Sequence, residues 1–168
     1  VLVGVRAAGL NRADLIQRKG FYPPPPGYSP NIPGLEFAGE VLEIGDAASS
    51  WHGGDRVFGI TAGEAQAAKL LVDSSHLTKI PELLSFNEAA AVPEAFIAAH
   101  DAVFPQGELK AGEALLLRAV GSGVGLAAVQ LAKAMGAKTI GTSRTAEKLE
   151  RAKMFGLNEA ILTGENAE

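Results

Sequence analysis

Residues 114–125 read Ala-Leu-Leu-Leu-Arg-Ala-Val-Gly-Ser-Gly-Val-Gly, a short apolar run that leads directly into a turn with glycine at 121, 123 and 125. From Leu126 to Met135, apolar side chains recur at the spacing of a helix, which ends at Gly136. Residues 138–142 then have the composition of a second buried strand. The order of strand, glycine turn, helix and strand predicts a βαβ unit.

The glycine turn predicts a site for a dinucleotide. Glycine lets the backbone approach a ligand closely, and the helix that follows points free N–H groups and its positive end outward, where a pyrophosphate fits. The spacing is Ala119-x-x-Ser122-x-x-Gly125, with serine where the usual fingerprint has glycine. A purely structural turn and a methyltransferase-type nucleotide site share this pattern and stay open. A P-loop phosphotransferase is disfavoured, because no Gly-Lys-Ser or Gly-Lys-Thr follows.

Composition narrows the function classes. The 168 residues are 47% hydrophobic and 20% charged, which is ordinary for a globular protein. A net charge of −4 without a basic block argues against a nucleic-acid partner or a membrane-surface patch, and no apolar run reaches the ~18 residues of a membrane span. The chain has no cysteine, which removes disulfides, thiol nucleophiles and cysteine-ligated metals and fits a reducing, cytoplasmic compartment.

The first half of the chain is predicted to be rich in β-structure. Short alternating segments, punctuated by glycine and proline, predict strands at residues 2–8, 37–44, 56–60 and 67–72. A short helix is expected over residues 12–19, and the prolines at 23–26 predict an extended surface loop.

Helices dominate the connection to the second half. Ser85 and Glu88 form a capping-box pattern for a helix that restarts after Pro93 and runs towards Phe104. From Gly112 onward the pattern is regular βαβ. Its last helix is expected from Glu147 to Phe155, capped by Thr145 and ended by Gly156, before a strand over residues 159–162.

Five blocks of the sequence carry a resemblance to a known family: Gly9-Leu10-Asn11-Arg12-Ala13-Asp14, Arg18-Lys19-Gly20-Phe21-Tyr22-Pro23, Pro33-Gly34-Leu35-Glu36-Phe37-Ala38-Gly39, Gly54-Asp55-Arg56-Val57 and Ala119 to Gly125. They occur in the order that medium-chain dehydrogenase/reductases have, and within that superfamily the chain resembles the zinc-free quinone oxidoreductases of zeta-crystallin type. The resemblance implies an α/β protein with a GroES-like β-rich domain over residues 1–105 and the first part of a Rossmann domain, a doubly wound parallel sheet, over residues 106–168. A complete domain of that kind has about six parallel strands. Since only about three are expected here, we expect a fragment of a longer enzyme, inactive alone.

The resemblance also bears on metals. Zinc-dependent members carry cysteine and histidine where this chain has Asn11 and Leu35, and neither replacement is a good zinc ligand. We therefore expect no metal. His52, His76 and His100 lie far apart in the sequence and are expected to be surface or packed histidines.

Without a metal, another group must stabilise the oxygen that gains charge during hydride transfer. The resemblance assigns this catalytic end to Tyr22 and Asn11, with Asn11 also near the cofactor. Packing against the prolines remains open for Tyr22, and a turn or cap role for Asn11. Asp14 and Glu36 are expected to be architectural.

NADPH is the predicted cofactor. NAD-binding proteins place Asp or Glu about 20 residues beyond the glycines, at the end of the second strand. Residues 141–148 here read Gly-Thr-Ser-Arg-Thr-Ala-Glu-Lys, with no carboxylate at the tip of that strand. Hydroxyl and cationic groups at this place suit a 2′-phosphate, and the resemblance matches Lys148 to a lysine that serves it. Pairing of the cations with Glu147 or Glu150 is the alternative. The full set of expected cofactor-binding residues is Asn11, Ala119, Gly121, Ser122, Gly123, Val124, Gly125, Ser143, Arg144 and Lys148.

The implied function is NADPH-dependent, zinc-free hydride transfer to quinones or related α,β-unsaturated carbonyls. Two other functions stay open: a nucleotide-binding protein without catalysis, in a redox-sensing or structural role, and an enoyl-thioester reductase of the same superfamily. A small quinone or enone is thus the expected partner. Members of the resembled family are commonly dimers, which implies a homodimer for the intact protein.

Overall fold

The computed structural model describes residues 1–46 and 50–164, and the chain divides into two compact units, Val1–Glu94 and Ala95–Glu168. The last residues of the expected second domain, 165–168, lie outside the described residues. The fold class predicted from the sequence is confirmed: a β-rich antiparallel unit precedes the start of a parallel α/β unit.

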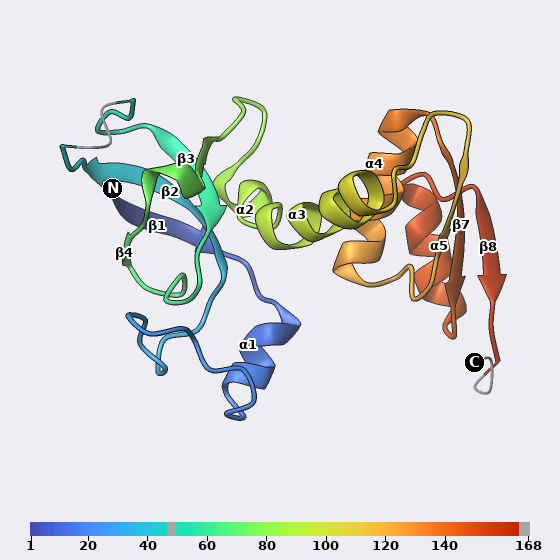
Figure 1. Ribbon diagram of the computed structural model, residues 1–168, viewed down its shortest axis with the longest axis horizontal. Coiled ribbons are helices and arrows are strands. Elements are labelled where there is room, and N and C mark those ends of the chain that lie inside the picture. Colours follow the sequence, from blue (N-terminus) through green and yellow to red (C-terminus); the bar gives the residue numbers. More distant parts are fainter. Residues whose placement is uncertain (47–49, 165–168) are drawn as a thin grey trace. The chain divides into compact units, whose positions relative to one another are not determined.

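An antiparallel sheet of five strands, in the order β4-β1-β2-β3-β5, forms the first unit (Figure 1). Val3, Phe37 and Val57 are fully buried at its core. The strands are β1 (Leu2–Ala8), β2 (Glu36–Glu43), β3 (Arg56–Ile60), β4 (Lys69–Leu71) and β5 (Leu77–Lys79), with a 3-10 turn, η1 (Ser74–His76), before the last. Four strands confirm the prediction within two residues at each end. The fifth was missed, because three residues are too few to show alternation.

Helix α1 (Arg12–Gln17) ends two residues earlier than predicted. The reason is Gly20, which adopts a left-handed φ of +79°. The N–H of Phe21 then donates back to the carbonyl of Ile16 at 3.1 Å, which closes the helix end.

The predicted capping box at Ser85 is confirmed. The Glu88 N–H donates to Ser85 Oγ at 3.3 Å, and the Ser85 N–H donates to Glu88 Oε2 at 2.8 Å. Helix α2 (Phe86–Ala89) follows, and α3 (Pro93–Asp101) restarts after a break. A π-helical turn, η2 (Ala102–Gln106), continues α3 past the predicted end near Phe104.

The second unit is a βαβαβ run with three parallel strands, as predicted, and these strands lie in the order β6-β7-β8. Its elements are β6 (Ala114–Leu117), α4 (Gly123–Met135), β7 (Lys138–Ser143), α5 (Ala146–Met154) and β8 (Glu159–Leu162). Helix α4 contacts β6 and β7, and α5 contacts β7 and β8, so both helices cover the same face of the sheet (Figure 1). Thr145 stands at the predicted N-cap of α5, but its side chain makes no capping bond.

The two faces of this sheet differ in their covering. Leu115 and Leu117 pack against buried residues of α4, whereas Leu116 between them is 60% exposed. Ile161 on β8 is also exposed. The register of the strands places Leu116 and Ile161 on the same face, opposite the face that α4 and α5 cover.

None of the helices among the described residues has the length and apolar character needed to cross a membrane.

Candidate functional site

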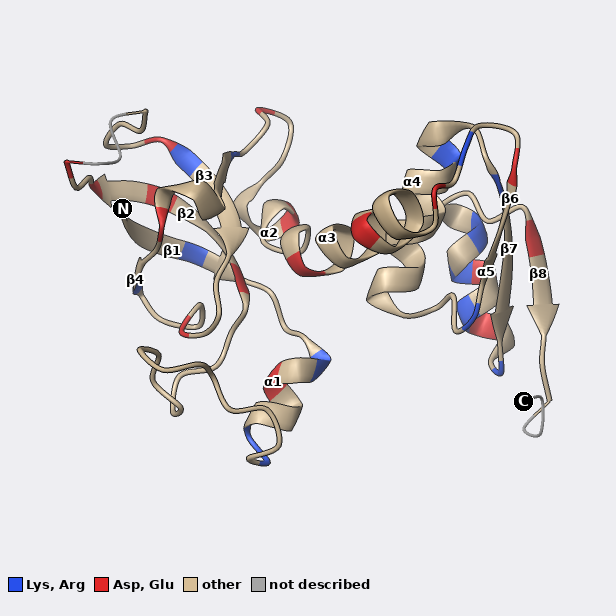
Figure 2. Ribbon diagram, viewed as in Figure 1, with Lys and Arg blue, Asp and Glu red and all other residues tan. Residues whose placement is uncertain are grey.

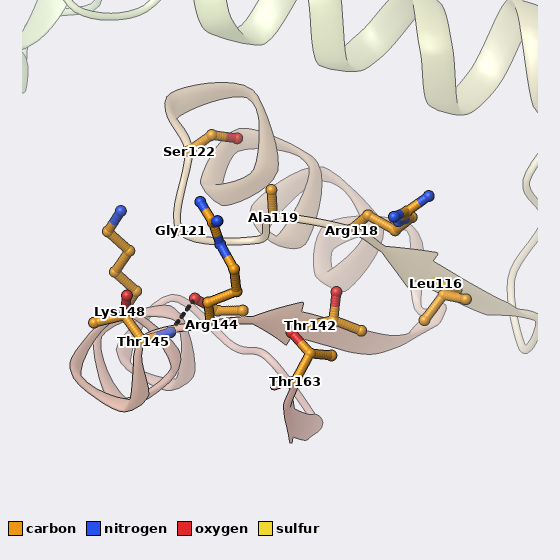
Figure 3. Close-up of a pocket in the computed structure, with 11 residues that line it drawn as sticks. Leu116, Arg118, Ala119, Gly121, Ser122, Thr142, Arg144, Thr145, Lys148 and Thr163 are labelled. Carbon is orange, nitrogen blue, oxygen red and sulfur yellow. Dashed lines mark hydrogen bonds between the residues drawn. The ribbon is translucent and has the colours of Figure 1, made fainter. Parts of the chain in front are cut away.

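A cavity of about 600 Å³ opens in the second unit, where the carboxyl ends of β6, β7 and β8 meet (Figure 3). Ligands of parallel α/β sheets bind at this edge. The cavity is lined by Leu116, Arg118, Ala119, Gly121, Ser122, Thr142, Ser143, Arg144, Thr145, Lys148 and Thr163.

The glycine turn after β6 forms one wall of the cavity. Ser122 is the N-cap of α4, and its Oγ accepts a hydrogen bond from the N–H of Gly125 at 3.1 Å. The first backbone bond of the helix is donated by Leu126 to the Ser122 carbonyl, at 2.9 Å. The N–H groups of Gly123 and Val124 therefore precede the helical hydrogen bonds, and the positive end of α4 lies beside the cavity. Such an end suits an anion.

Packing explains the glycine at 125. A Cβ there would lie 2.6 Å from the Val120 carbonyl oxygen, a backbone atom that cannot rotate away. The turn also holds Ala119 at a φ of +52°, which is unusual for a residue with a side chain. Gly125 thus lets α4 start directly against the turn that follows β6.

The opposite wall is basic. Arg144 follows β7 and Lys148 lies in the first turn of α5; in Figure 3 both side chains extend toward the turn that carries Gly121. Ser143, which also lines the cavity, is only 9% exposed, and its Oγ accepts a hydrogen bond from the Thr145 N–H at 3.1 Å. The Ser143 hydroxyl keeps its own proton for donation to another group.

The alternative was that Arg144 and Lys148 form ion pairs with Glu147 or Glu150. Glu150 accepts a hydrogen bond from Lys153 at 2.7 Å. Within residues 1–46 and 50–164, no carboxylate oxygen lies within 4.0 Å of the charged nitrogens of Arg144 or Lys148. Both kinds of charge alternate along α5 (Figure 2).

The structure thus brings six of the expected cofactor residues to one cavity: Ala119, Gly121, Ser122, Ser143, Arg144 and Lys148. Gly123, Val124 and Gly125 form the first turn of α4 and are not among the lining residues. Sequence reasoning missed Leu116, Arg118, Thr142, Thr145 and Thr163 as lining residues. Their shared signal is a place at or just after the carboxyl end of a predicted strand.

Asn11 belongs to the first unit, where it precedes α1. Its Nδ2 donates to Glu36 Oε1 at 2.7 Å. A carboxylate only accepts hydrogen bonds, so this contact fixes the orientation of the amide. One N–H of Asn11 is therefore engaged, and Asn11 is also the N-cap of α1, in a capping box with Asp14.

Glu36 and Asp14 have the architectural role that was expected of them. Glu36 is 4% exposed, and its other oxygen accepts the N–H of Glu94 at the start of α3, at 2.9 Å. Asp14 is 5% exposed and accepts the N–H groups of Asn11 at 2.8 Å and Gly34 at 3.2 Å. Burial, with the nearby carboxylates of Glu36 and Asp14, raises the pKa of Glu94 above its ordinary value.

Tyr22 lies on the loop before the prolines, in the same unit, with 48% of its surface exposed. Within the described part of this unit, no hydrogen bond joins Tyr22 to Asn11. The structure therefore leaves the phenol accessible but does not assemble the two residues into one hydrogen-bonded group.

The positions that correspond to zinc ligands are unsuited to a metal. Asn11 is bound to Glu36, and Leu35 is buried and apolar. Across residues 1–46 and 50–164, no three His, Cys, Asp or Glu side chains gather in a way that could hold a metal ion.

Comparison with protein families matches most of the chain. Residues 1–105 match the alcohol dehydrogenase GroES-like domain, and residues 123–168 match a family described as zinc-binding dehydrogenase. Human quinone oxidoreductase is 37% identical over 162 residues, which cover 96% of this chain and 49% of the relative.

Solved structures show the same fold. The quinone oxidoreductase of Escherichia coli, complexed with NADPH, superposes with a TM-score of 0.87 at 33% identity over 99% of this chain and 51% of that one. The CurK enoyl reductase superposes with a TM-score of 0.84 at 26% identity over 96% of this chain and 51% of that one. The chain spans about half the length of the curated relatives that it matches.

Proposed function

The chain belongs to the alcohol dehydrogenase GroES-like family, among the quinone oxidoreductase relatives of the medium-chain dehydrogenase/reductases, and from this premise we propose that the intact protein is an NADPH-dependent reductase. Its substrates are quinones or related α,β-unsaturated carbonyls, and it works without zinc. The observation that carries the proposal is the cavity between the glycine turn and two free cations, Arg144 and Lys148.

The cavity suits a dinucleotide with a 2′-phosphate. In this proposal the amides at the start of α4 hold the pyrophosphate, and Ser143, Arg144 and Lys148 bind the 2′-phosphate. Charge-assisted hydrogen bonds contribute about 1.5–3 kcal/mol each, so two of them favour NADPH over NADH by about a hundredfold or more. NADPH is also the ligand of the Escherichia coli relative.

Asn11 and Tyr22 are the proposed catalytic residues. The bound cofactor supplies the hydride, and the protein supplies positioning and hydrogen bonds. Glu36 holds the amide of Asn11 in one orientation, so the second N–H of this amide is already oriented for the cofactor or substrate. The exposed phenol of Tyr22 can donate to the oxygen that gains charge.

The proposal also includes the domain boundary, the oligomeric state and the location of the intact protein. The family match ends at residue 105, as the expected first domain does, while the compact units divide at Glu94, within the start of α3. We retain the division into residues 1–105 and 106–168. A homodimer is the form that the resemblance implies for the intact protein, and the lack of cysteine fits a cytoplasmic location.

An enoyl-thioester reductase is the second candidate, favoured by the likeness to the CurK enoyl reductase. It differs from the first in substrate alone, since both need hydride delivery to an activated double bond. Nucleotide binding without turnover is the third.

The experiment is NADPH oxidation by the intact protein, with a panel of quinones, enones and enoyl-thioesters, each assayed with and without a metal chelator. We expect turnover of quinones or enones that the chelator leaves unchanged. Turnover of thioesters alone would establish the second candidate. Tight NADPH binding with no turnover on any acceptor would establish the third, and loss of activity with the chelator would contradict zinc independence.

A further inference from the structure

We propose that Gly121, because it has no side chain, lets the stem of Lys148 lie against the backbone of the turn and so holds the lysine in place over the cavity. Gly121 is then a positioning residue for selectivity toward the 2′-phosphate. The inference rests on the proposed function and names a determinant of its cofactor choice. A Cβ built on Gly121 would lie 2.7 Å from Cβ, 3.1 Å from Cγ and 2.9 Å from Cδ of Lys148. Most of the lysine stem therefore lies directly on the backbone of the turn.

This contact restricts a side chain that is otherwise flexible. An exposed lysine samples many rotamers, and ordering it costs side-chain conformational entropy. The backbone of Gly121 forms a flat support along the stem, so the ammonium is already directed to the side that Arg144 also occupies (Figure 3). Preorganisation of this kind lowers the cost of binding an anion.

The position of Lys148 on its helix favours the same interpretation. Thr145 is the N-cap of α5, which places Lys148 at the third helical position, near the positive end of the helix. A cation at this end is unfavourable for the helix itself. A bound phosphate would offset that cost, which gives the cation a reason to be there.

The backbone of Gly121 does not itself require glycine. Its φ lies outside the left-handed region, unlike that of Gly136 at +80°, so alanine can adopt its conformation. The cost of Gly121→Ala therefore comes from the contact with Lys148. Since the nearest atom is the Cβ of Lys148, fixed on α5, the lysine stem and the turn must move apart.

The chain offers a matched control two residues away. A Cβ on Gly123 would meet only the Cβ of Ala95, at 3.8 Å, which is an ordinary van der Waals distance. Gly123→Ala places the same methyl group in the same turn without touching Lys148. Any effect that it has falls on both dinucleotides alike, because its position is at the start of α4 and not at the basic wall.

The test measures dissociation constants of NADPH and NADH by calorimetry on the intact protein and on four variants: Gly121→Ala, Gly123→Ala, Lys148→Met and the double variant Gly121→Ala/Lys148→Met. We expect Gly121→Ala and Lys148→Met each to reduce the preference for NADPH by about tenfold or more, the worth of one charge-assisted bond. The double variant should reduce it no further than Lys148→Met, and Gly123→Ala should leave the preference unchanged.

The outcomes separate the two levels of the proposal. If the unaltered protein has no preference for NADPH, the proposed cofactor is wrong and this inference falls with it. If that preference exists and Gly121→Ala retains it, the inference alone is overturned. If Gly121→Ala binds neither dinucleotide, Gly121 supports the turn itself rather than Lys148, and the inference is again overturned.

Discussion

The carboxylate of Glu36 ties together two residues that lie far from it in the chain. One oxygen accepts the amide of Asn11 and the other accepts the backbone N–H of Glu94. The same side chain fills the space above Gly9, where a Cβ would overlap it. At the scale of single residues, the order of this part of the first unit depends on one buried acid with both oxygens engaged.

Glu36→Gln should lower the free energy of unfolding by about 1–3 kcal/mol, because the amide offers one acceptor oxygen and turns its NH₂ toward a second donor. Denaturant unfolding of the intact protein measures this. Glu40→Gln, on the same strand, is the control: among the described residues Glu40 pairs with Arg6 across 3.6 Å, and both side chains are well exposed. That change should be worth about 0.5 kcal/mol or less, and equal effects for the two variants would contradict the role of Glu36.

Tyr22→Phe should lower kcat by roughly ten- to a thousandfold with little change in NADPH affinity, if the phenol donates to the developing charge. Steady-state kinetics and the dissociation constant of NADPH check this on the intact protein. Tyr28→Phe serves as the control, since Tyr28 lies on the same loop as Tyr22 and packs against Gly63. An unchanged kcat for Tyr22→Phe would return Tyr22 to a packing role.

At the scale of elements, the stability of the start of α3 depends on pH through Glu94, whose charge is unfavourable there. The pKa of Glu94 is raised by burial and by Glu36 and Asp14. Glu94 therefore contributes to stability fully below the ordinary pKa of a glutamate, and this contribution is lost as pH rises through the raised value of the folded protein.

Glu94→Gln removes this dependence, because glutamine is neutral at every pH. We expect the variant to gain thermal stability over the unaltered protein at about pH 7, and the gain to shrink toward zero below about pH 4. Melting temperatures across that range measure it. A difference that stays constant with pH would show that the charge of Glu94 is not the cause.

Elements with strong local signals were predictable from the sequence. This is true of the strand, glycine turn and helix around Ser122, because periodicity and capping are local properties. Strand β5 was not, because its three residues are a strand only through pairing with β3. The end of α1 depended on the left-handed conformation of Gly20, which a glycine permits but does not dictate.

The site was predictable only in part, for a reason of topology. Gly121 and Lys148 could be named from their motifs, whereas Arg118 and Thr163 line the cavity only because β6 and β8 end at the same edge as β7. The contact between Gly121 and Lys148 joins a turn and a helix that are separated in the chain by α4 and β7, and no local pattern indicates it.

At the scale of the whole molecule, one face of the parallel sheet is bare among the described residues. On this face, Leu116 and Ile161 are 60% and 47% exposed. Exposed apolar sheet surface and unpaired edges promote association. Residues 1–168 expressed alone should therefore aggregate and bind a hydrophobic dye such as ANS.

Leu116→Thr should reduce dye binding by these 168 residues, whereas Leu83→Thr should not, since Leu83 is 96% exposed but belongs to the first unit. Fluorescence titration and light scattering provide the measurements. A sharp, cooperative unfolding transition together with micromolar NADPH affinity for this chain alone would contradict the expectation.

In the proposed function, Arg144 and Lys148 select a cofactor with a 2′-phosphate. The most direct test of this claim is the pair of dissociation constants for NADPH and NADH, measured on the intact protein and on Arg144→Ala/Lys148→Ala at low and high salt. We predict a preference for NADPH of about a hundredfold or more, weakened by salt and abolished in the double variant. Equal affinities in the unaltered protein, or an undiminished preference in the double variant, would contradict the claim.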